Sequence, residues 1–123
     1  MKAVFVESTE FTAWVSAFLP DEAYAKFQQE LMDHPEKGAV MRGCGGLRKV
    51  RTADPKRGRG KRGGARVIYL YVAETKWFFM LDIYGKDEKD DLSAAEKREL
   101  AKLANKFKRQ AKTAVKRWEG KVN

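Results

Sequence analysis

The pattern of hydrophobic and polar positions predicts a strand and two short helices in the N-terminal third of the chain. Residues 3–6 form an apolar run typical of a buried strand. Apolar residues then recur three and four positions apart, a spacing that places them on one face of a helix. These positions are Phe11, Trp14, Val15 and Phe18 in the first segment, and Tyr24, Phe27 and Leu31 in the second. Ser8 or Thr9 can cap the first helix and Pro20 separates the two, so we expect a helical hairpin.

The middle of the chain changes to the period of two that is expected of strands. Residues 39–52 have strand character, broken at 43–46 by Gly-Cys-Gly-Gly, which predicts a bulge or a turn. Residues 66–72 alternate and residues 77–84 form an aromatic, apolar run, with a hairpin turn expected between them at 74–76. Residues 54–64 hold one proline, four glycines and five basic residues, a composition that predicts a mobile loop.

A long amphipathic helix is expected at about residues 93–118. Ser93 and Glu96 have the spacing of a capping box. The apolar residues behind them repeat at helical spacing; they are Leu100, Leu103, Phe107, Ala111, Val115 and Trp118. The order of elements predicts one α+β domain over residues 1–123, with a small, mostly antiparallel sheet, an N-terminal helical hairpin and a long C-terminal helix.

Charge changes this picture because it is concentrated in two blocks. The chain has 26 basic and 17 acidic residues, a net charge of +9 and a pI near 9.7. Residues 42–66 alone carry a net +9 and residues 93–123 a net +7, whereas the other segments are acidic. This arrangement favours a polyanionic partner over a general solubility charge. The alternative is that each block is a solvated face.

The rarer residue types limit the chemistry. A single cysteine, Cys44, excludes an internal disulfide and a multi-cysteine zinc site, and a single histidine, His34, excludes a two-histidine nuclease. The carboxylates at 87–91 are more typical of a helix N-terminus than of a metal site, so no metal or cofactor is expected. The chain has no apolar run of about 20 residues and no signal-peptide pattern, so we expect a cytoplasmic protein.

Strand alternation brings cations together on one side of the predicted sheet. It places Lys49 and Arg51 on one face and Val50 on the other, and it begins the next strand with Arg66. If these strands are neighbours, Lys49, Arg51, Arg66, Lys86 and Tyr84 could converge on one site. An ordinary polar face of a half-buried sheet explains the same alternation equally well.

A basic cluster of this kind permits RNA cleavage without a metal. Crowded cations lower one another's pKa, which allows a lysine to act as a general base on a ribose 2′-hydroxyl. Arginines directed at the non-bridging oxygens would stabilise the charge of the pentavalent transition state. The products would be a 2′,3′-cyclic phosphate and a free 5′-hydroxyl.

Three motifs together resemble a known family. The runs at 45–51 (GGLRKVR), 58–69 (GRGKRGGARVIY) and 84–93 (YGKDEKDDLS) are similar to the HigB-like branch of the RelE/ParE toxin superfamily. These are toxins of bacterial type II toxin–antitoxin systems, and the resemblance covers most of the chain. It implies a RelE-like fold and a ribosome-dependent endoribonuclease that cuts translated mRNA in the ribosomal A site and so inhibits translation.

The resemblance also implies roles for individual residues. Lys49, Arg51, Arg66 and Lys86 match the catalytic basic residues, with Lys49 as the general base and Arg66 as the phosphate-stabilising arginine. The expected RNA-binding residues are Arg48, Arg59, Lys61, Arg62, Tyr84 and Lys89. The sequence departs from the best-known RelE members in two places: Asp87 stands where they have an arginine, and no tyrosine follows Tyr84.

The resemblance implies a cognate antitoxin, in HigB-like pairs usually a helix-turn-helix DNA-binding protein, together with mRNA and ribosomal RNA as partners. Two other functions remain open. One is a non-catalytic RNA- or DNA-binding module whose loop at 54–64 and terminal helix contact phosphates. The other is a ParE-like gyrase-inhibiting toxin, which the presence of the basic cluster disfavours. Association of the basic helix with a membrane surface is a further alternative, disfavoured because a small domain needs that apolar stripe in its core.

Overall fold

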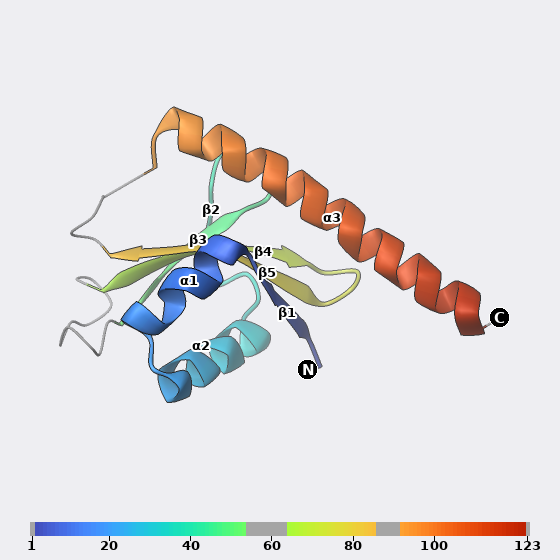
Figure 1. The fold of residues 1–123 in the computed structure, drawn as a ribbon, viewed down its shortest axis with the longest axis horizontal. Coiled ribbons are helices and arrows are strands. Elements are labelled where there is room, and N and C mark those ends of the chain that lie inside the picture. The colour runs from blue at the N-terminus through green and yellow to red at the C-terminus, as the bar shows by residue number, and fades with distance from the viewer. Residues whose placement is uncertain (1, 54–63, 86–91, 123) are drawn as a thin grey trace.

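The computed structural model describes residues 2–53, 64–85 and 92–122, with side chains described as far as residue 114. The described residues form five strands and three helices (Figure 1). In chain order these are β1 (Val4–Glu7), α1 (Thr9–Phe18), α2 (Asp21–Asp33), β2 (Ala39–Val40), β3 (Arg48–Thr52), β4 (Ala65–Val72), β5 (Trp77–Gly85) and α3 (Ala94–Val122). The α+β class, the helical hairpin and the long C-terminal helix are confirmed.

The sheet has the strand order β1-β5-β4-β3-β2. Among the described strands, β1 alone runs parallel to its neighbour, and the other pairs are antiparallel. The segment expected as one interrupted strand at 39–52 is two strands, because residues 41–47 turn back on themselves. Their backbones are joined from Met41 N to Leu47 O, at 2.9 Å, so the glycine-rich run is a turn rather than a bulge.

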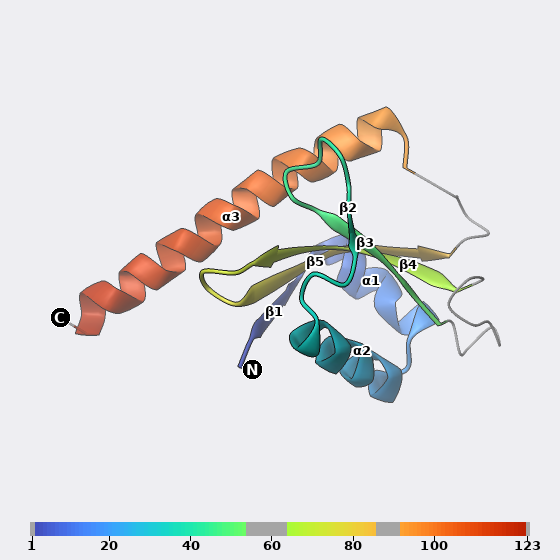
Figure 2. The same ribbon diagram turned by 180° about the vertical axis from the view of Figure 1, so that it is seen from behind.

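Each face of the sheet is covered by helix. On one face, α1 and α2 pack on a core that includes Val67, Tyr69, Phe78 and Met80. On the other, α3 packs over Leu70 and its neighbours, and Phe107 stacks on Phe79 with ring centroids 4.5 Å apart. Figures 1 and 2 show the hairpin and α3 on opposite sides of the sheet, with the far end of α3 extending past it.

The beginning of α1 is fixed to the sheet by its cap. The Ser8 hydroxyl accepts a hydrogen bond from Phe11 N, at 3.0 Å, and donates one to Leu81 O, at 2.7 Å. Phe11 and Phe18 are buried as expected, but Trp14 is 52% exposed. Trp14 lies beyond the edge of the surface that the sheet offers to α1, beside a pocket between α1 and α3.

The turn that begins α3 is the predicted capping box. Ser93 N donates to Glu96 Oε1, at 2.9 Å, and Glu96 N donates to Ser93 Oγ, at 3.1 Å. Further along, the glycine turn at 43–46 packs against α3. Gly45 has a φ of +67°, and a Cβ added to it would lie 3.5 Å from the Cβ of Ala104. None of the described helices has both the length and the apolar composition of a membrane span.

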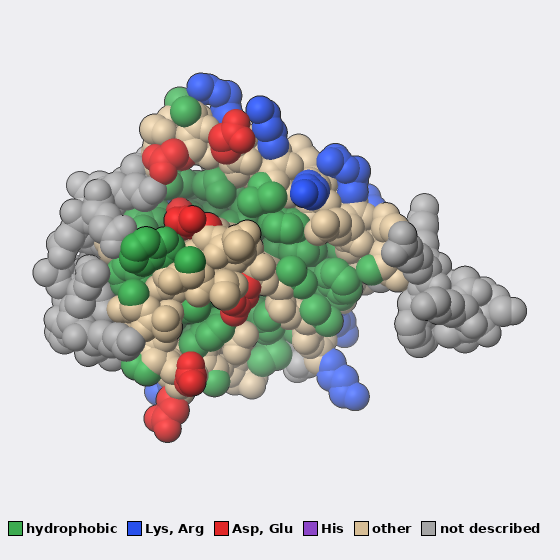
Figure 3. All heavy atoms as spheres, viewed as in Figure 1, with side chains coloured by type: hydrophobic (Ala, Val, Ile, Leu, Met, Phe, Trp, Pro, Cys, Tyr) green, Lys and Arg blue, Asp and Glu red, His purple; other side chains and the backbone are tan. Residues whose placement is uncertain are grey.

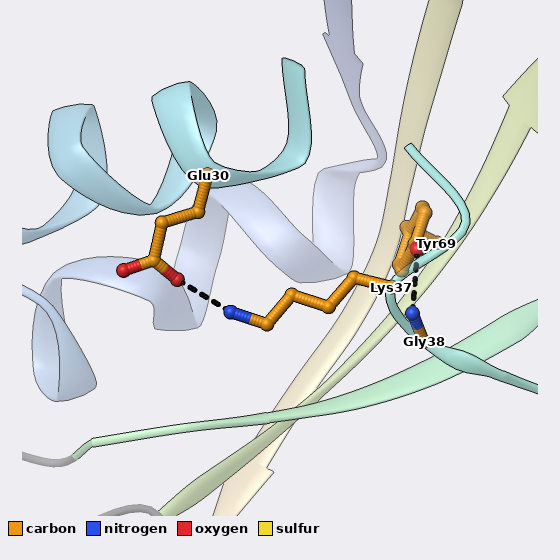
Figure 4. Close-up of polar contacts among 4 residues, drawn as sticks. All are labelled: Glu30, Lys37, Gly38 and Tyr69. Atoms are coloured by element: carbon orange, nitrogen blue, oxygen red, sulfur yellow. Dashed lines mark hydrogen bonds and ion pairs between the residues drawn. The ribbon is translucent and has the colours of Figure 1, made fainter. Parts of the chain in front are cut away.

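Tyr69 holds the loop between α2 and β2 against the face of the sheet that α1 and α2 cover. Its hydroxyl donates to Pro35 O, at 2.8 Å, and accepts from Gly38 N, at 3.0 Å. A Cβ on Gly38 would lie 2.9 Å from the Tyr69 ring, so only glycine fits there. Figure 4 shows the hydrogen bond between Gly38 N and the Tyr69 hydroxyl beside the Lys37–Glu30 ion pair, whose Nζ–Oε2 distance is 2.9 Å.

We expect Tyr69→Phe to lower the free energy of unfolding by about 1–3 kcal/mol, because the buried Gly38 N–H and the Pro35 carbonyl lose their partner. Urea unfolding at neutral pH measures this change. Tyr71→Phe on the same strand is the control, since its half-buried ring stays packed on Phe78. Equal stability losses in the two variants would contradict the role of the Tyr69 hydroxyl.

The half-buried Tyr24 and the buried Tyr69 make the free energy of unfolding depend on pH in the alkaline range. Burial, together with a 2.6 Å hydrogen bond to Glu7 Oε2, raises the pKa of Tyr24 well above its usual value. Burial also raises the pKa of Tyr69. Because these tyrosines keep their protons in the folded state after the unfolded chain has lost them, the free energy of unfolding falls as the pH rises above about 10.

Tyr24→Phe should make this alkaline decline less steep, by up to about 1.4 kcal/mol per pH unit for the proton removed. Urea unfolding of both proteins from about pH 8 to about pH 11 measures the two slopes. Parallel slopes would show that Tyr24 titrates alike in the folded and unfolded states.

Candidate functional site

The pairing of three strands aligns two arginines and a tyrosine across one face of the sheet. Arg51 on β3 pairs with Arg66 on β4, and Arg66 pairs with Tyr84 on β5. Directly opposed residues point to the same face, with Cβ atoms about 4.5–5.5 Å apart. Arg51, Arg66 and Tyr84 therefore form a row, and we call this set together with Lys49 the basic row.

Lys49 lies on the same face, one alternation along β3 from Arg51. It pairs with Ile68, which packs in the core beneath α3 and so fixes which face Lys49 shares. Two residues along a strand span about 6.8 Å, so Lys49 and Arg51 can contact one phosphodiester group from adjacent positions. The predicted convergence of Lys49, Arg51, Arg66 and Tyr84 on one face is thus what the register produces.

Tyr84 reaches this face because β5 contains a bulge. The register shifts between Ile68, which pairs with Asp82, and Tyr69, which pairs with Met80, so that Leu81 is the extra residue. Before the bulge, Phe78 and Met80 face the helical hairpin; after it, Ile83 does so. Strict alternation from Met80 would have turned Tyr84 toward the hairpin, and the bulge turns it toward Arg66.

The members of the basic row differ in burial. Arg66 is only 6% exposed, and its Nη1 donates to Gly64 O, at 3.2 Å. Lys49 is half-buried and Arg51 is exposed. The hydrogen bond to Gly64 O fixes the guanidinium of Arg66, so it is a preorganised donor for anionic oxygens. The side chain of Arg51 is exposed and can adjust its conformation to a bound phosphate.

The face that carries the basic row has two ends, one packed against α3 and one that carries the candidate site. Its other end is hydrophobic and lies under α3, where Leu70, Val72 and Phe79 meet Phe107 and Ala111. The basic row occupies the end where β3 stops, β4 begins and β5 stops. α3 thus supports the sheet at one end of this face and leaves Arg51 exposed at the other.

Several predicted site residues are not brought into this row. Arg48 faces the opposite side of β3, where its Nη1 donates to Gly38 O, at 2.8 Å, and to Glu36 O, at 3.2 Å. It holds the loop that Tyr69 also fastens, and its role in RNA binding stays a prediction. The remaining candidates lie outside the described residues: Arg59, Lys61, Arg62, Lys86 and Lys89. The same holds for the carboxylates at 87–91.

The other reactive side chains lie away from the basic row. His34 caps the C-terminus of α2, with its backbone N–H on Glu30 O at 2.9 Å. Cys44 is buried within the glycine turn. Within residues 2–53, 64–85 and 92–122, no group of three His, Cys, Asp or Glu side chains is placed to hold a metal ion.

One acidic residue on the site face was not singled out from the sequence. Asp82 pairs with Ile68, so it lies in the same transverse line as Lys49. A signal was present, since Asp82 is the one charged residue in the apolar run 77–84. Its face could not be read from alternation, because the bulge immediately before it breaks the period.

Comparison with known proteins identifies the family. A family model described as the RelE toxin of the RelE/RelB toxin–antitoxin system matches residues 19–121. The chain belongs to the RelE toxin family. RelE membership makes it a toxin of a toxin–antitoxin system, consistent with inhibition of translation, and implies an antitoxin partner.

A solved structure gives a second comparison. The chain is similar to the isolated RelE toxin of E. coli, at 17% sequence identity and a TM-score of 0.47. The match covers 83% of this chain and 99% of the E. coli protein.

Proposed function

We propose that this RelE family member is an endoribonuclease of the HigB-like branch that cleaves translated mRNA in the ribosomal A site without a metal. The observation that carries the proposal is the basic row, which holds Lys49, Arg51 and Arg66 on one face of two paired strands. Three cations at phosphate spacing are suited to holding a scissile phosphodiester.

The proposed reaction is attack by a ribose 2′-oxygen on the adjacent phosphorus. Lys49, in its neutral form, accepts the 2′-hydroxyl proton as the new P–O bond forms and the bond from phosphorus to the 5′-oxygen breaks. Arg66 and Arg51 donate hydrogen bonds to the non-bridging oxygens, whose negative charge increases in the pentavalent transition state. The leaving 5′-oxygen takes a proton, giving a 5′-hydroxyl and a 2′,3′-cyclic phosphate.

The need for a ribosome follows from positioning. In-line attack requires the 2′-oxygen, the phosphorus and the 5′-oxygen to be nearly collinear, and extended mRNA seldom adopts this geometry. The basic row supplies charge and a base from one open side. The ribosome is proposed to supply the opposite side, holding the codon against the sheet.

The proposal is tested by incubating the purified protein with a defined mRNA, alone and on programmed ribosomes. We expect cleavage within the A-site codon only when ribosomes are present, and upstream fragments that end in a cyclic phosphate. Intact mRNA on ribosomes, together with salt-sensitive binding to free RNA, would instead establish a non-catalytic RNA-binding module. Inhibition of DNA gyrase without mRNA cleavage would establish the ParE-like function.

A further inference from the structure

An acidic groove, opposite in charge to the basic row, lies between α1, the end of β5 and the first turns of α3. A pocket of about 600 Å³ forms its centre, and Trp14, Tyr84, Leu92 and Leu100 line it. An adjoining pocket of about 430 Å³ shares Leu100 and continues the groove along α3. Figure 3 shows hydrophobic side chains gathered between α1 and α3, with acidic side chains next to them.

The groove exists because β1 is shorter than β5. The pairing of β1 with β5 ends at Glu7 and Met80, where the chain turns into α1. β5 continues to Gly85 without β1 beside it. On the edge away from β4, the end of β5 is therefore flanked by α1 and α3, and the 52% exposure of Trp14 follows from its place at this edge.

The groove is acidic although the chain is basic. Four carboxylate residues line its central pocket, namely Glu10, Asp82, Glu96 and Glu99, and the lining of this pocket includes no lysine or arginine among the described residues. Lys106 lines the adjoining pocket but not this one. This local charge contrasts with a net charge of +9 for the whole protein.

Glu99, one of the carboxylates that α3 contributes, keeps much of its charge. Glu99 meets Lys102 at 3.4 Å, but about three quarters of each side chain is exposed, so solvent screens the pair strongly. Glu96 accepts the capping hydrogen bond from Ser93 N, which orients its carboxylate at the edge of the groove. An exposed indole surrounded by carboxylates is a surface that a cationic, partly apolar ligand would cover.

We propose that this groove binds a basic amphipathic segment of a partner protein. Its apolar side chains would cover Trp14 and Leu100, while its lysines or arginines would pair with Glu10, Glu96 and Glu99. RNA is excluded as an occupant because its phosphates would face the same carboxylates. The groove is therefore a protein-binding surface that shares Tyr84 with the basic row but none of its cations, and it is independent of whether that row cleaves RNA.

A synthetic amphipathic peptide provides the test. The probe is a 15-residue helix of leucine and lysine, with leucines three and four residues apart, titrated into the purified full chain by calorimetry. Because the whole protein is positively charged, general electrostatics would repel this peptide, so binding reports a local acidic site. The same peptide with glutamate in place of lysine should not bind the groove.

Two changes separate the apolar and ionic contributions. Trp14→Ala should weaken binding about tenfold or more, as is typical of an aromatic anchor, and Glu96→Gln with Glu99→Gln about three- to tenfold. Glutamine at 96 can keep the capping box. The matched control is Glu22→Gln with Glu36→Gln, two exposed carboxylates away from the groove, which should leave the affinity unchanged.

Absence of binding, or equal affinity in the groove and control variants, would overturn the inference. Cleavage of mRNA on ribosomes should proceed at the wild-type rate in Trp14→Ala, because Trp14 lies outside the basic row. Peptide calorimetry thus tests the groove, and mRNA cleavage on ribosomes tests the basic row, so either proposal can fail without the other.

Discussion

Arg66→Ala is expected to lower the rate of ribosome-dependent mRNA cleavage by about 100- to 1,000-fold, the loss typical of removing one preorganised donor to a transition-state oxyanion. Arg66 stands at the centre of the basic row, between Arg51 and Tyr84, and is almost fully buried. Burial keeps its guanidinium in one place and reduces solvent screening of its charge. No exposed cation can replace both properties.

Single-turnover cleavage on programmed ribosomes measures this loss, and thermal unfolding shows whether the variant is folded. Arg66→Lys keeps the charge but loses the bidentate geometry, so it should recover only part of the rate. Arg42→Ala, which removes an exposed arginine next to the glycine turn, is the matched control. Wild-type cleavage by a folded Arg66→Ala protein would remove Arg66 from the proposed mechanism.

Lys49→Ala is expected to lower the same rate by about 100- to 10,000-fold, because general-base catalysis contributes that much. Lys49→Arg separates the two things a lysine can do. Arginine keeps the positive charge but stays protonated, so it cannot accept the 2′-hydroxyl proton. If Lys49 is the base, both variants should be inactive to a similar degree while still binding ribosomes.

Lys26→Ala on the exposed side of α2 is the control for net charge and should cleave at the wild-type rate. Recovery of activity in Lys49→Arg would contradict the general-base role and assign Lys49 to charge stabilisation. The rate as a function of pH adds a second readout, since loss of a titrating base removes one limb of the profile.

Much of the fold could be predicted because local signals and packing agree. The capping box of Ser93 and Glu96 forms as its spacing indicates, and Phe11, Phe27 and Leu31 are buried as their helical period requires. Trp14 has the same period but is exposed. Periodicity gives the direction of a side chain on its helix, and only the width of the opposing sheet decides whether that side chain is covered.

The candidate site shows a similar limit. Alternation placed Lys49, Arg51 and Arg66 correctly, because β3 and the first half of β4 pair without interruption. It puts Arg48 on the opposite face with Val50, but it could not give the partners of Arg48, which are carbonyl groups of a loop ten or more residues earlier in the chain. It also could not place Tyr84, because a bulge belongs to a pair of strands and leaves no periodic signal in either one.

The bulge in β5 also determines where this chain can change length. Deleting Leu81 would remove the extra residue and restore strict pairing, and Tyr84 would stay opposite Arg66 on the face it already occupies. Deleting one residue from the turn at 73–76 would shorten the connection between β4 and β5 and would leave the faces of both strands unchanged. Within one hairpin, the tip and the bulge can therefore each lose a residue during evolution while Tyr84 stays beside Arg66.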